Sequence, residues 1–331
     1  MIEISLRKKE NHHPVLSFEI PTPFSIGAVH SYILCGDRVT LVDTGPKTEK
    51  AWRSFVYQLN EKGLRIRDID QIILTHQHVD HSGLLRTIKE HHPSVKVFAH
   101  SWTIPWIKRE PNFIQQKLAF FQRLFSENGL SDNEILDVEN FYYSLDQFMD
   151  STPIDGVLED GSNIEGLKNW NVIHSPGHSQ GHIVLYNGKN RDLIAGDHII
   201  GHTSAGAFIE PAISENEPRP KSVVDYRNSL LKIRKLSLNK IYSGHGAVIH
   251  NPYEVIDHQL ERFERKKRQL ESFLKQGNFS VYELMKLVYP NRYQKHLALY
   301  FAEVIGHLDL LEEEGKVILF KEQGIIRYQL V

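Results

Sequence analysis

Three histidines and one aspartate lie within the short segment of residues 76–81. The segment follows an apolar run that predicts a strand, so its side chains leave a rigid element and enter a loop. Because alternate residues of an extended backbone point to the same side, His76 and His78 can bind one cation. Asp80 and His81 follow at the turn and can face a second cation. A plain polar turn capped by Asp80 would not need all three histidines, so the segment predicts a catalytic metal site.

Three more candidate ligands occur later in the chain, each after an apolar run. His178 lies in a loop rich in glycine and proline, Asp197 follows residues 193–196, and His245 lies between two glycines after residues 240–242. A single histidine or aspartate at the end of a strand is more often structural. The same arrangement repeated three times predicts that one edge of a sheet gathers these side chains with those of the first segment.

The order of the apolar patterns predicts an α/β fold in which helices cover mixed sheets. Strands are expected at residues 15–20, 31–35, 39–42, 71–75 and 95–99, from about 157 to 194, and at 240–242. Helices are expected at residues 47–62, 83–91 and 223–236.

Residues 102–150 interrupt this alternation of strands and helices. Apolar side chains, among them Phe113, Phe121 and Phe125, recur there at helical spacing. Two interpretations remain equally open for this helical insertion. It packs on the core, or it forms a lid over the active site.

The last part of the chain has the order of elements found in a winged helix. A long amphipathic helix ends near residue 276, and a capping-box pattern at Ser280 opens a short helix. A further helix at residues 296–314 and two β runs follow. We therefore place a domain boundary near residue 251 and expect a catalytic domain and a small α+β domain, at residues 1–251 and 252–331.

At these positions the chain resembles the metallo-β-lactamase superfamily, over about residues 15–250. The segment at residues 76–81, followed by His178, Asp197 and His245 in that order, is similar to the ligand set of that family. The run Leu41-Val42-Asp43-Thr44-Gly45 resembles its early strand-and-turn motif. The resemblance implies an αββα sandwich with the site at one edge.

The resemblance also implies a role for each candidate residue. The first cation would take His76, His78 and His178, the second would take Asp80, His81 and His245, and Asp197 would bridge the two. Asp43 would lie behind the ligands and hold them in place, although a turn-capping role is equally open. His182 would support the ligands or be structural. His202, in a glycine-flanked loop, is a candidate for a hydrogen bond to substrate.

Two divalent cations are the implied cofactors, with zinc favoured and iron or manganese also suited to these ligands. The two cations would share a water molecule and lower its pKa from ~15.7 toward neutrality, so that hydroxide forms beside the substrate. Asp80 is the candidate catalytic residue, because it could orient this nucleophile or carry its proton. The predicted enzyme is a metal-dependent hydrolase of an ester, a thioester or a related small-molecule bond.

RNA is the alternative substrate, and two features weigh against it. Only 48 residues separate Asp197 from His245 (245 minus 197), too few for the extra domain of one nuclease branch of the family. The last domain resembles the tail of a branch close to glyoxalase II, in which an animal member cleaves single-stranded RNA. Its candidate recognition helix is acidic, which disfavours a winged-helix nucleic-acid-binding protein and favours packing or homodimer formation. The basic run at residues 265–268 is interpreted as a solvated helix face.

The composition agrees with a globular enzyme. Of 331 residues, 40% are hydrophobic and the net charge is -2, which gives no sign of bulk nucleic-acid binding. One cysteine, Cys35, allows no disulfide within the chain, and the first 16 residues have no apolar run typical of an export signal. We expect a cytoplasmic protein with no membrane span, because no run of about 18 apolar residues occurs.

Overall fold

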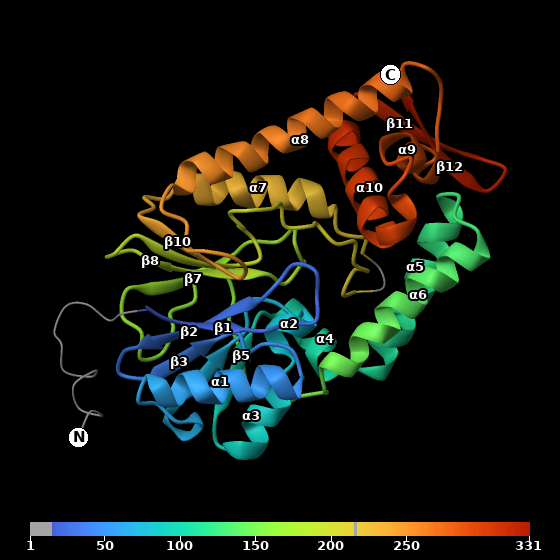
Figure 1. Cartoon of the computed structure of the whole chain (residues 1–331). Coiled ribbons are helices and arrows are strands. Elements are labelled where there is room, and N and C mark those ends of the chain that lie inside the picture. Colours follow the sequence, from blue (N-terminus) through green and yellow to red (C-terminus); the bar gives the residue numbers. More distant parts are fainter. Residues whose placement is uncertain (1–14, 215–216) are drawn as a thin grey trace.

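Two β-sheets lie face to face between two layers of helices, as the sequence predicts (Figure 1). The structure is a computed structural model that describes residues 15–214 and 217–331. The segment scanned for an export signal lies largely outside the described residues. None of the described helices is long and apolar enough to cross a membrane.

The first sheet orders its strands β1-β2-β3-β4-β5-β6 along the described chain. Neighbours from β1 to β3 are antiparallel, and neighbours from β3 to β6 are parallel. The central β3 and β4 are buried along their whole length, as expected of strands covered on both faces. The strands are β1 (Val15–Ile20), β2 (Val29–Cys35), β3 (Val39–Val42), β4 (Gln71–Ile73), β5 (Lys96–Ala99) and β6 (Gly156–Val157).

The second sheet has the order β10-β9-β8-β7. Its strands β7, β8 and β9 are antiparallel neighbours, and β10 pairs in parallel with β9. The pairing of β10 shifts register between Tyr242 and Ser243, and such an irregularity redirects the chain just before His245. The strands are β7 (Trp170–His174), β8 (Ile183–Asn187), β9 (Asp192–Gly196) and β10 (Lys240–Ser243).

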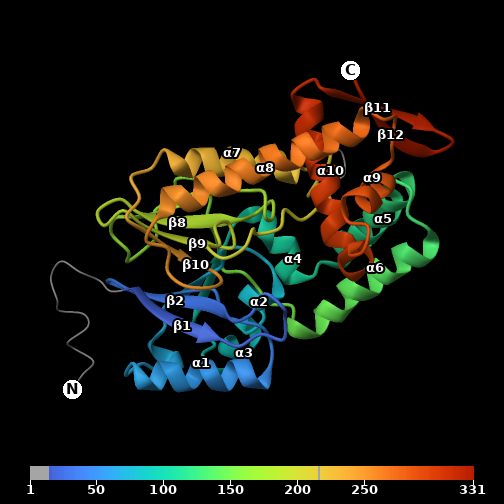
Figure 2. The ribbon, with the colours of Figure 1, turned by 45° about the horizontal axis from the view of Figure 1, so that its top comes forward.

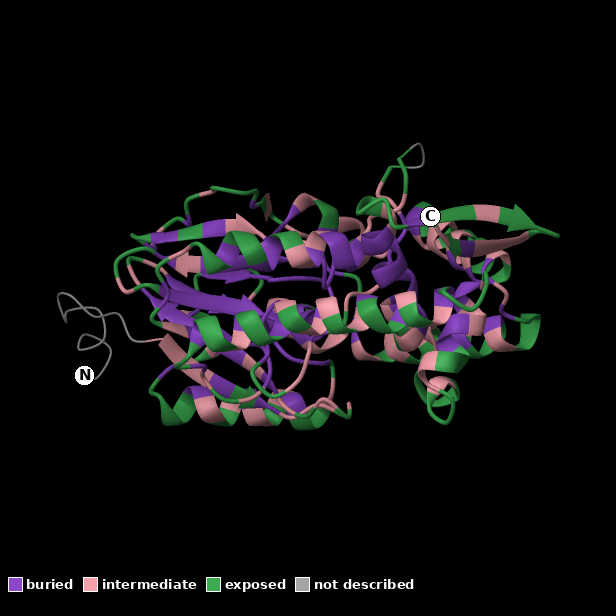
Figure 3. Cartoon of the chain, turned by 90° about the horizontal axis from the view of Figure 1, so that it is seen from above, coloured by how far each residue is buried: buried purple, intermediate pink, exposed green. Residues whose placement is uncertain are grey.

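Apolar side chains of the four layers form buried clusters. Figure 3 shows much of the strands in the purple of buried residues. Between the sheets, residues such as Leu34, Ile73 and Leu185 are buried together. The outer helices pack on the far faces of the sheets, where they bury Phe55 on one side and Leu230 on the other. These helices are α1 (Glu49–Glu61) and α3 (Leu85–His91) on the first sheet, and α7 (Ser222–Arg234) and α8 (Pro252–Leu274) on the second.

The insertion at residues 102–150 is helical, as predicted, but its main partner is not the sandwich. Phe121 and Phe125 belong to one apolar cluster with Leu284 and Phe301 of the C-terminal unit, and the rings of Phe125 and Phe301 lie 4.8 Å apart. Figure 2 shows the insertion and the C-terminal helices beside each other at one end of the sandwich. The insertion consists of α4 (Ile104–Lys108), α5 (Pro111–Glu127) and α6 (Asp132–Leu145).

The C-terminal unit contains the predicted helices and hairpin. Ser280 caps its helix as expected, accepting a hydrogen bond from the backbone of Glu283. The proposed recognition helix is largely buried, with Phe301, Ile305 and Leu308 inside the apolar cluster, so this face of the helix packs within the chain. The elements after α8 are α9 (Val281–Val288), α10 (Leu297–Glu313), β11 (Val317–Glu322) and β12 (Ile325–Leu330).

The interpretation of residues 265–268 as one solvated face is wrong. Consecutive residues of a helix point in different directions, and here Lys267 is buried and ion-paired with Glu264, at 3.0 Å, and with Glu314. Lys266 is half-buried against Tyr289. Only part of the run therefore faces solvent.

A buried ion pair connects the sandwich to the C-terminal unit. The Arg219 guanidinium donates hydrogen bonds of 2.8 and 2.6 Å to Asp309 of α10. We expect Arg219→Met to lower the free energy of unfolding by about 3 kcal/mol, because it leaves a buried carboxylate without its partner. Chemical denaturation measures this loss. The control Arg86→Met breaks the exposed pair with Glu90 and should cost less than about 1 kcal/mol. Equal losses in the two variants would show that the buried pair contributes nothing special.

Candidate metal centre

Strand ends bring the seven predicted ligand residues together. His76 and His78 follow β4, the one-turn helix α2 (Val79–Ser82) presents Asp80 and His81, and the others follow β7, β9 and β10. Within the described residues, side-chain atoms suited to metal binding converge in three overlapping groups. These groups are His76, His78 and His178; His76, His81 and Asp197; and Asp80, His81 and His245.

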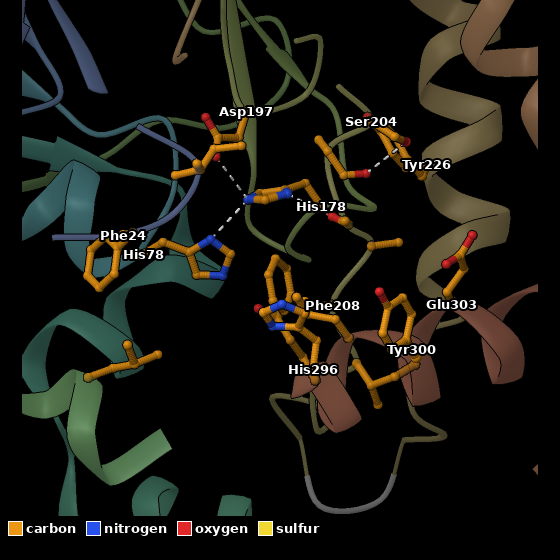
Figure 4. Close-up of a pocket in the computed structure, with 18 of the residues that line it drawn as sticks. Phe24, His78, His178, Asp197, Ser204, Phe208, Tyr226, His296, Tyr300 and Glu303 are labelled. Carbon is orange, nitrogen blue, oxygen red and sulfur yellow. Dashed lines mark hydrogen bonds and ion pairs between the residues drawn. The ribbon is translucent and has the colours of Figure 1, made fainter. Parts of the chain in front are cut away.

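The first group consists of three imidazoles. The Nδ1 atom of His78 lies 3.0 Å from Nε2 of His76. The same atom lies 2.9 Å from Nε2 of His178, and Figure 4 shows these two rings facing each other. His76 and His178 therefore present Nε2 to the centre, whereas His78 presents Nδ1. All three nitrogens point to one position.

The two carboxylates lie between this group and the remaining imidazoles. Oδ1 of Asp197 is 3.2 Å from Nε2 of His81, and its Oδ2 is 3.6 Å from Nε2 of His178 and 3.5 Å from Nε2 of His245. Asp80 places Oδ2 3.4 Å from Nε2 of His245. Asp197 thus contacts imidazoles of both halves of the centre.

Hydrogen bonds behind the centre fix the orientation of the imidazoles. Nδ1 of His81 lies 2.8 Å from Oδ2 of Asp43, which also accepts a hydrogen bond from the hydroxyl of Thr75, and Oδ1 of Asp43 accepts one from the Thr75 backbone. Nδ1 of His178 and Nδ1 of His245 each donate to a backbone carbonyl at 2.7 Å. A proton held at Nδ1 leaves Nε2 with a free lone pair facing the centre, which is the tautomer that binds a metal.

Asp43 adopts an unusual backbone conformation. Its φ of 58° is in the left-handed region, which aspartate tolerates better than most residues. This turn after β3 carries the buried carboxylate to both Thr75 and His81. Asp43 thus contacts both the turn backbone at Thr75 and the imidazole of His81.

The side chains fit a bound cation in spacing and in unsatisfied polar atoms. Two atoms that bind one zinc ion at 2.0–2.1 Å with tetrahedral geometry lie about 3.3 Å apart, and the separations here are 2.9–3.6 Å. His81 Nε2, His245 Nε2 and Asp197 Oδ1 are buried and have no hydrogen-bond partner among the described residues. Buried polar atoms rarely remain unsatisfied, so these atoms are suited to hold cations.

The charges of the centre favour cations as well. Burial lowers the pKa of His78 to about 3 and that of His76 well below its ordinary value, so both imidazoles keep their lone pairs. Burial would raise the pKa of Asp197, but His81 and His245 hold it well below its usual range. Burial opposes protonation of His245, but Asp197 nevertheless raises its pKa to about 10. A cation that binds to the His245 nitrogen would compete with this proton.

Comparison with known proteins decides the family. Residues 25–245, two thirds of the chain, match the family described as the metallo-beta-lactamase superfamily. This chain belongs to the metallo-β-lactamase superfamily. The match begins in the loop before β2 and ends at the last predicted ligand, His245.

Relatives extend the similarity beyond the ligand region. The probable metallo-hydrolase YqjP of Bacillus subtilis is 30% identical over 315 residues, which cover 95% of this chain and 97% of that protein. The crystal structure of the metallo-beta-lactamase family protein TTHA1429 from Thermus thermophilus has a TM-score of 0.77 and 25% identity, over 96% of this chain and 98% of that one. The atrochrysone carboxyl ACP thioesterase of Aspergillus fumigatus is 23% identical over 76% of this chain and 61% of that protein. The chain is a metal-dependent hydrolase of this superfamily.

Two further sequence candidates lie in different places. The ring of His182 is buried 4.9 Å from that of His76, and neither of its nitrogens has a hydrogen-bond partner among the described residues, so it packs directly behind a proposed ligand. His202 is exposed and does not line the cavity described below; its ring lies against Gly246. The structure therefore offers no support for contact between His202 and a substrate in that cavity.

Sequence patterns did not reveal Glu210, although it braces the centre. One of its carboxylate oxygens accepts a hydrogen bond from the side chain of Gln77, at 2.5 Å, and the other accepts one from the backbone of Gln180, at 2.8 Å. Gln77 lies between two ligand histidines, and Gln180 lies in the loop of His178. The buried carboxylate thus ties two ligand loops together, across 133 and 30 residues of sequence.

The metal centre forms one end of a cavity of about 1270 Å³. The other walls come from the insertion and from the C-terminal helices, so three distant parts of the chain enclose it (Figure 4). Near the centre, the ring of Phe208 lies 4.8 Å from that of His78 and 5.3 Å from that of His178. The insertion therefore supplies one wall of this cavity, and its role as a lid stays a prediction.

Glu210 generates a testable pH dependence. Burial raises its pKa to about 7, above the ordinary 4.5, so its contribution to stability is largest below pH 4.5 and is lost as the pH rises to 7. Between these pH values the loss should approach about 3 kcal/mol. We expect Glu210→Gln to lack this loss, as measured by denaturant unfolding of both proteins at several pH values. The exposed Glu61→Gln variant is the control, and it should follow the parent protein. Identical curves for Glu210→Gln and the parent would contradict the prediction.

Proposed function

We propose that this chain hydrolyses an ester or thioester with two divalent cations held by the seven clustered side chains. The convergence of three overlapping ligand groups at the end of a large cavity carries this proposal. Convergence in overlapping groups supports two neighbouring positions rather than one, because no single ion could bind all seven residues.

The distances support a division of the ligands. His76, His78 and His178 would hold the first cation, and Asp80, His81 and His245 would hold the second. Asp197 would bridge them, since its two oxygens face imidazoles of both sets. When bound, the cations would lower the pKa of a water molecule and polarise the carbonyl oxygen of the substrate. Nitrogen and carboxylate ligands at this spacing favour zinc, and iron or manganese also accept them.

Asp80 is the residue proposed to move the proton. It lines the cavity and is half-buried, as is His78, whereas the other five proposed ligands are buried. Its carboxylate can orient the attacking water and accept a proton from it. The water oxygen then adds to the carbonyl carbon, the carbon–sulfur or carbon–oxygen bond breaks, and the departing thiol or alcohol carries away a proton. The acid is the second product.

A thioester is the bond we favour. The relative named atrochrysone carboxyl ACP thioesterase is 23% identical to this chain over three quarters of its length. We also infer a place near the glyoxalase II-like branch with a winged-helix tail, because the C-terminal unit orders its helices and hairpin in that way. Both inferences concern which bond the enzyme cleaves, because the metal ligands alone do not distinguish a thioester from an ester.

Single-stranded RNA is the second candidate, because basic side chains of α8 line the same cavity. The packing of α10 weakens it. Much of the helix that would enter a groove is buried, including Phe301 and Leu308, and the helix carries four carboxylates and no lysine or arginine. RNA is therefore included in the substrate test as the alternative substrate.

A substrate panel with the purified, metal-analysed protein tests the function. We expect turnover of short acyl thioesters, weaker turnover of esters and lactones, and none of phosphodiesters or single-stranded RNA. Removal of the metals by a chelator should abolish turnover, and zinc should restore it. RNA cleavage without thioester cleavage would overturn the proposal in favour of the alternative substrate.

The bridging role of Asp197 predicts a joint loss. Asp197→Ala should lower the bound metal by about half or more and abolish turnover, because the variant loses a ligand shared by both positions. Elemental analysis and thioester turnover measure the two effects. The exposed His258→Ala variant removes a histidine elsewhere and should keep both. Full metal content together with normal activity in Asp197→Ala would rule out the bridge.

A further inference from the structure

The cavity is larger than a small thioester requires. Its volume of about 1270 Å³ exceeds the roughly 300–1,000 Å³ typical of pockets for drug-sized ligands. It extends from the metal centre to α10, where Tyr300 and Glu303 face it (Figure 4). The space beyond the metal centre therefore accommodates a further part of the substrate.

The wall formed by the insertion is apolar. Trp106, Ile114, Phe141 and Leu145 line it, and its two guanidinium and ammonium groups both have contacts within the insertion. Arg109 is paired with Asp146 at 2.7 Å, and the Lys117 ammonium lies over the rings of Trp106 and Tyr142. Burying an apolar chain against such a surface makes a favourable contribution to the free energy of binding.

The wall formed by the C-terminal unit carries cations that lack partners. Arg262 lines the cavity from α8, and Arg292 lines it from the segment after α9. The guanidinium groups of both make no ion pair and no hydrogen bond with the described residues. Arg265 lies beside them with only a loose pair, 3.9 Å from Glu261. Free guanidinium groups that share a cavity favour phosphate, which they bind through charge-assisted hydrogen bonds.

The acidic groups of the cavity do not cancel this charge. Glu303 forms an ion pair with Lys266 at 3.5 Å and accepts a hydrogen bond from the hydroxyl of Tyr289. Glu210 accepts hydrogen bonds from its two amide donors. The carboxylates of the metal centre are balanced within that centre. The excess charge facing the cavity from the C-terminal unit is therefore positive.

Four of the rings that line the cavity are already stacked in pairs, so they are poorly placed to stack on the bases of RNA. Tyr289 and Tyr300 stack on each other, with ring centroids 4.0 Å apart, and Phe121 stacks on Tyr142 at 5.2 Å. Single-strand binding proteins instead present open rings to successive bases. An apolar wall opposite unpaired arginines fits a ligand with one apolar and one anionic part.

We propose that the substrate is an amphipathic acyl thioester whose acyl chain lies against the insertion and whose phosphate-bearing thiol lies against Arg262 and Arg292. This inference rests on the proposed thioesterase function and specifies its substrate class. Hydrolysis adds water across the carbon–sulfur bond and yields a fatty acid and a phosphate-bearing thiol. Such a thiol can be free or attached to a carrier protein, and the chemistry recognised by the arginines is the same.

Matched thioesters test the inference. Octanoyl-coenzyme A and octanoyl-N-acetylcysteamine share the acyl chain and the scissile bond, and only the first carries phosphates. We expect a KM for the coenzyme A ester at least about tenfold lower than for the short ester, since charge-assisted hydrogen bonds to phosphate are strong. Arg262→Gln and Arg292→Gln should each remove most of this difference by raising the first KM and leaving the second unchanged. Arg268→Gln, an exposed cation on the same helix outside the cavity, is the control.

A binding measurement separates this inference from catalysis. Coenzyme A should bind the metal-free protein in calorimetry, pantetheine without phosphate should bind at least about tenfold more weakly, and Arg262→Gln should abolish the difference. The thiol of the natural substrate can be free or bound to a carrier protein, and a third substrate distinguishes the two. A lower KM for octanoyl-phosphopantetheine on a carrier protein than for octanoyl-coenzyme A would show that the enzyme prefers the protein-bound thiol.

The outcomes are distinct. Equal KM values for the two octanoyl esters, unchanged in the arginine variants, would overturn the phosphate site and leave the thioesterase function standing. Absence of turnover with every thioester would overturn the proposed function itself. RNA cleavage that depends on Arg262 and Arg292 would assign the same cations to a nucleic acid and refute the amphipathic substrate.

Discussion

Burying imidazole nitrogens and carboxylate oxygens against one another, without hydrogen bonds to satisfy them, costs several kcal/mol of free energy. The metal centre contains seven such side chains, and several of their atoms have no hydrogen-bond partner in the part of the chain that the structure describes. Bound cations offset this cost. Before they bind, a rigid frame must keep the side chains from moving apart. The frame consists of strand ends, the carboxylate of Asp43 and two backbone carbonyls that fix His178 and His245.

Much of this centre could be predicted from the sequence because each ligand has a local signal. The strands and helices follow the apolar periodicity closely, and β1 and β3 begin and end at the predicted residues. Each ligand follows a short apolar strand, so its location at a sheet edge follows from the strand itself. Asp43 was also visible, as part of a strand-and-turn motif, and its left-handed backbone explains why that turn can carry a carboxylate inward.

The parts that escaped prediction depend on contacts between distant segments. Glu210 has no motif around it, and its role appears only when the chain brings Gln77 and Gln180 to its two oxygens. The partner of the insertion was equally hidden, because an amphipathic helix shows that it has an apolar face but not what covers that face. Here the C-terminal unit covers it, so the insertion and the last 80 residues build one core across the expected domain boundary.

The basic run on α8 shows how this third dimension changes a functional interpretation. Four consecutive cations form a patch in the sequence, but a helix turns about 100° per residue and separates them. Lys267 turns inward to Glu314, Arg268 faces solvent, and Arg265 and Lys266 reach the cavity. A run that would suggest a nucleic-acid surface thus supplies cations to an enclosed pocket. The sandwich edge fixes the chemistry, and the two added helical units shape the space in which a substrate must fit, so metal ligands and substrate preference can vary independently.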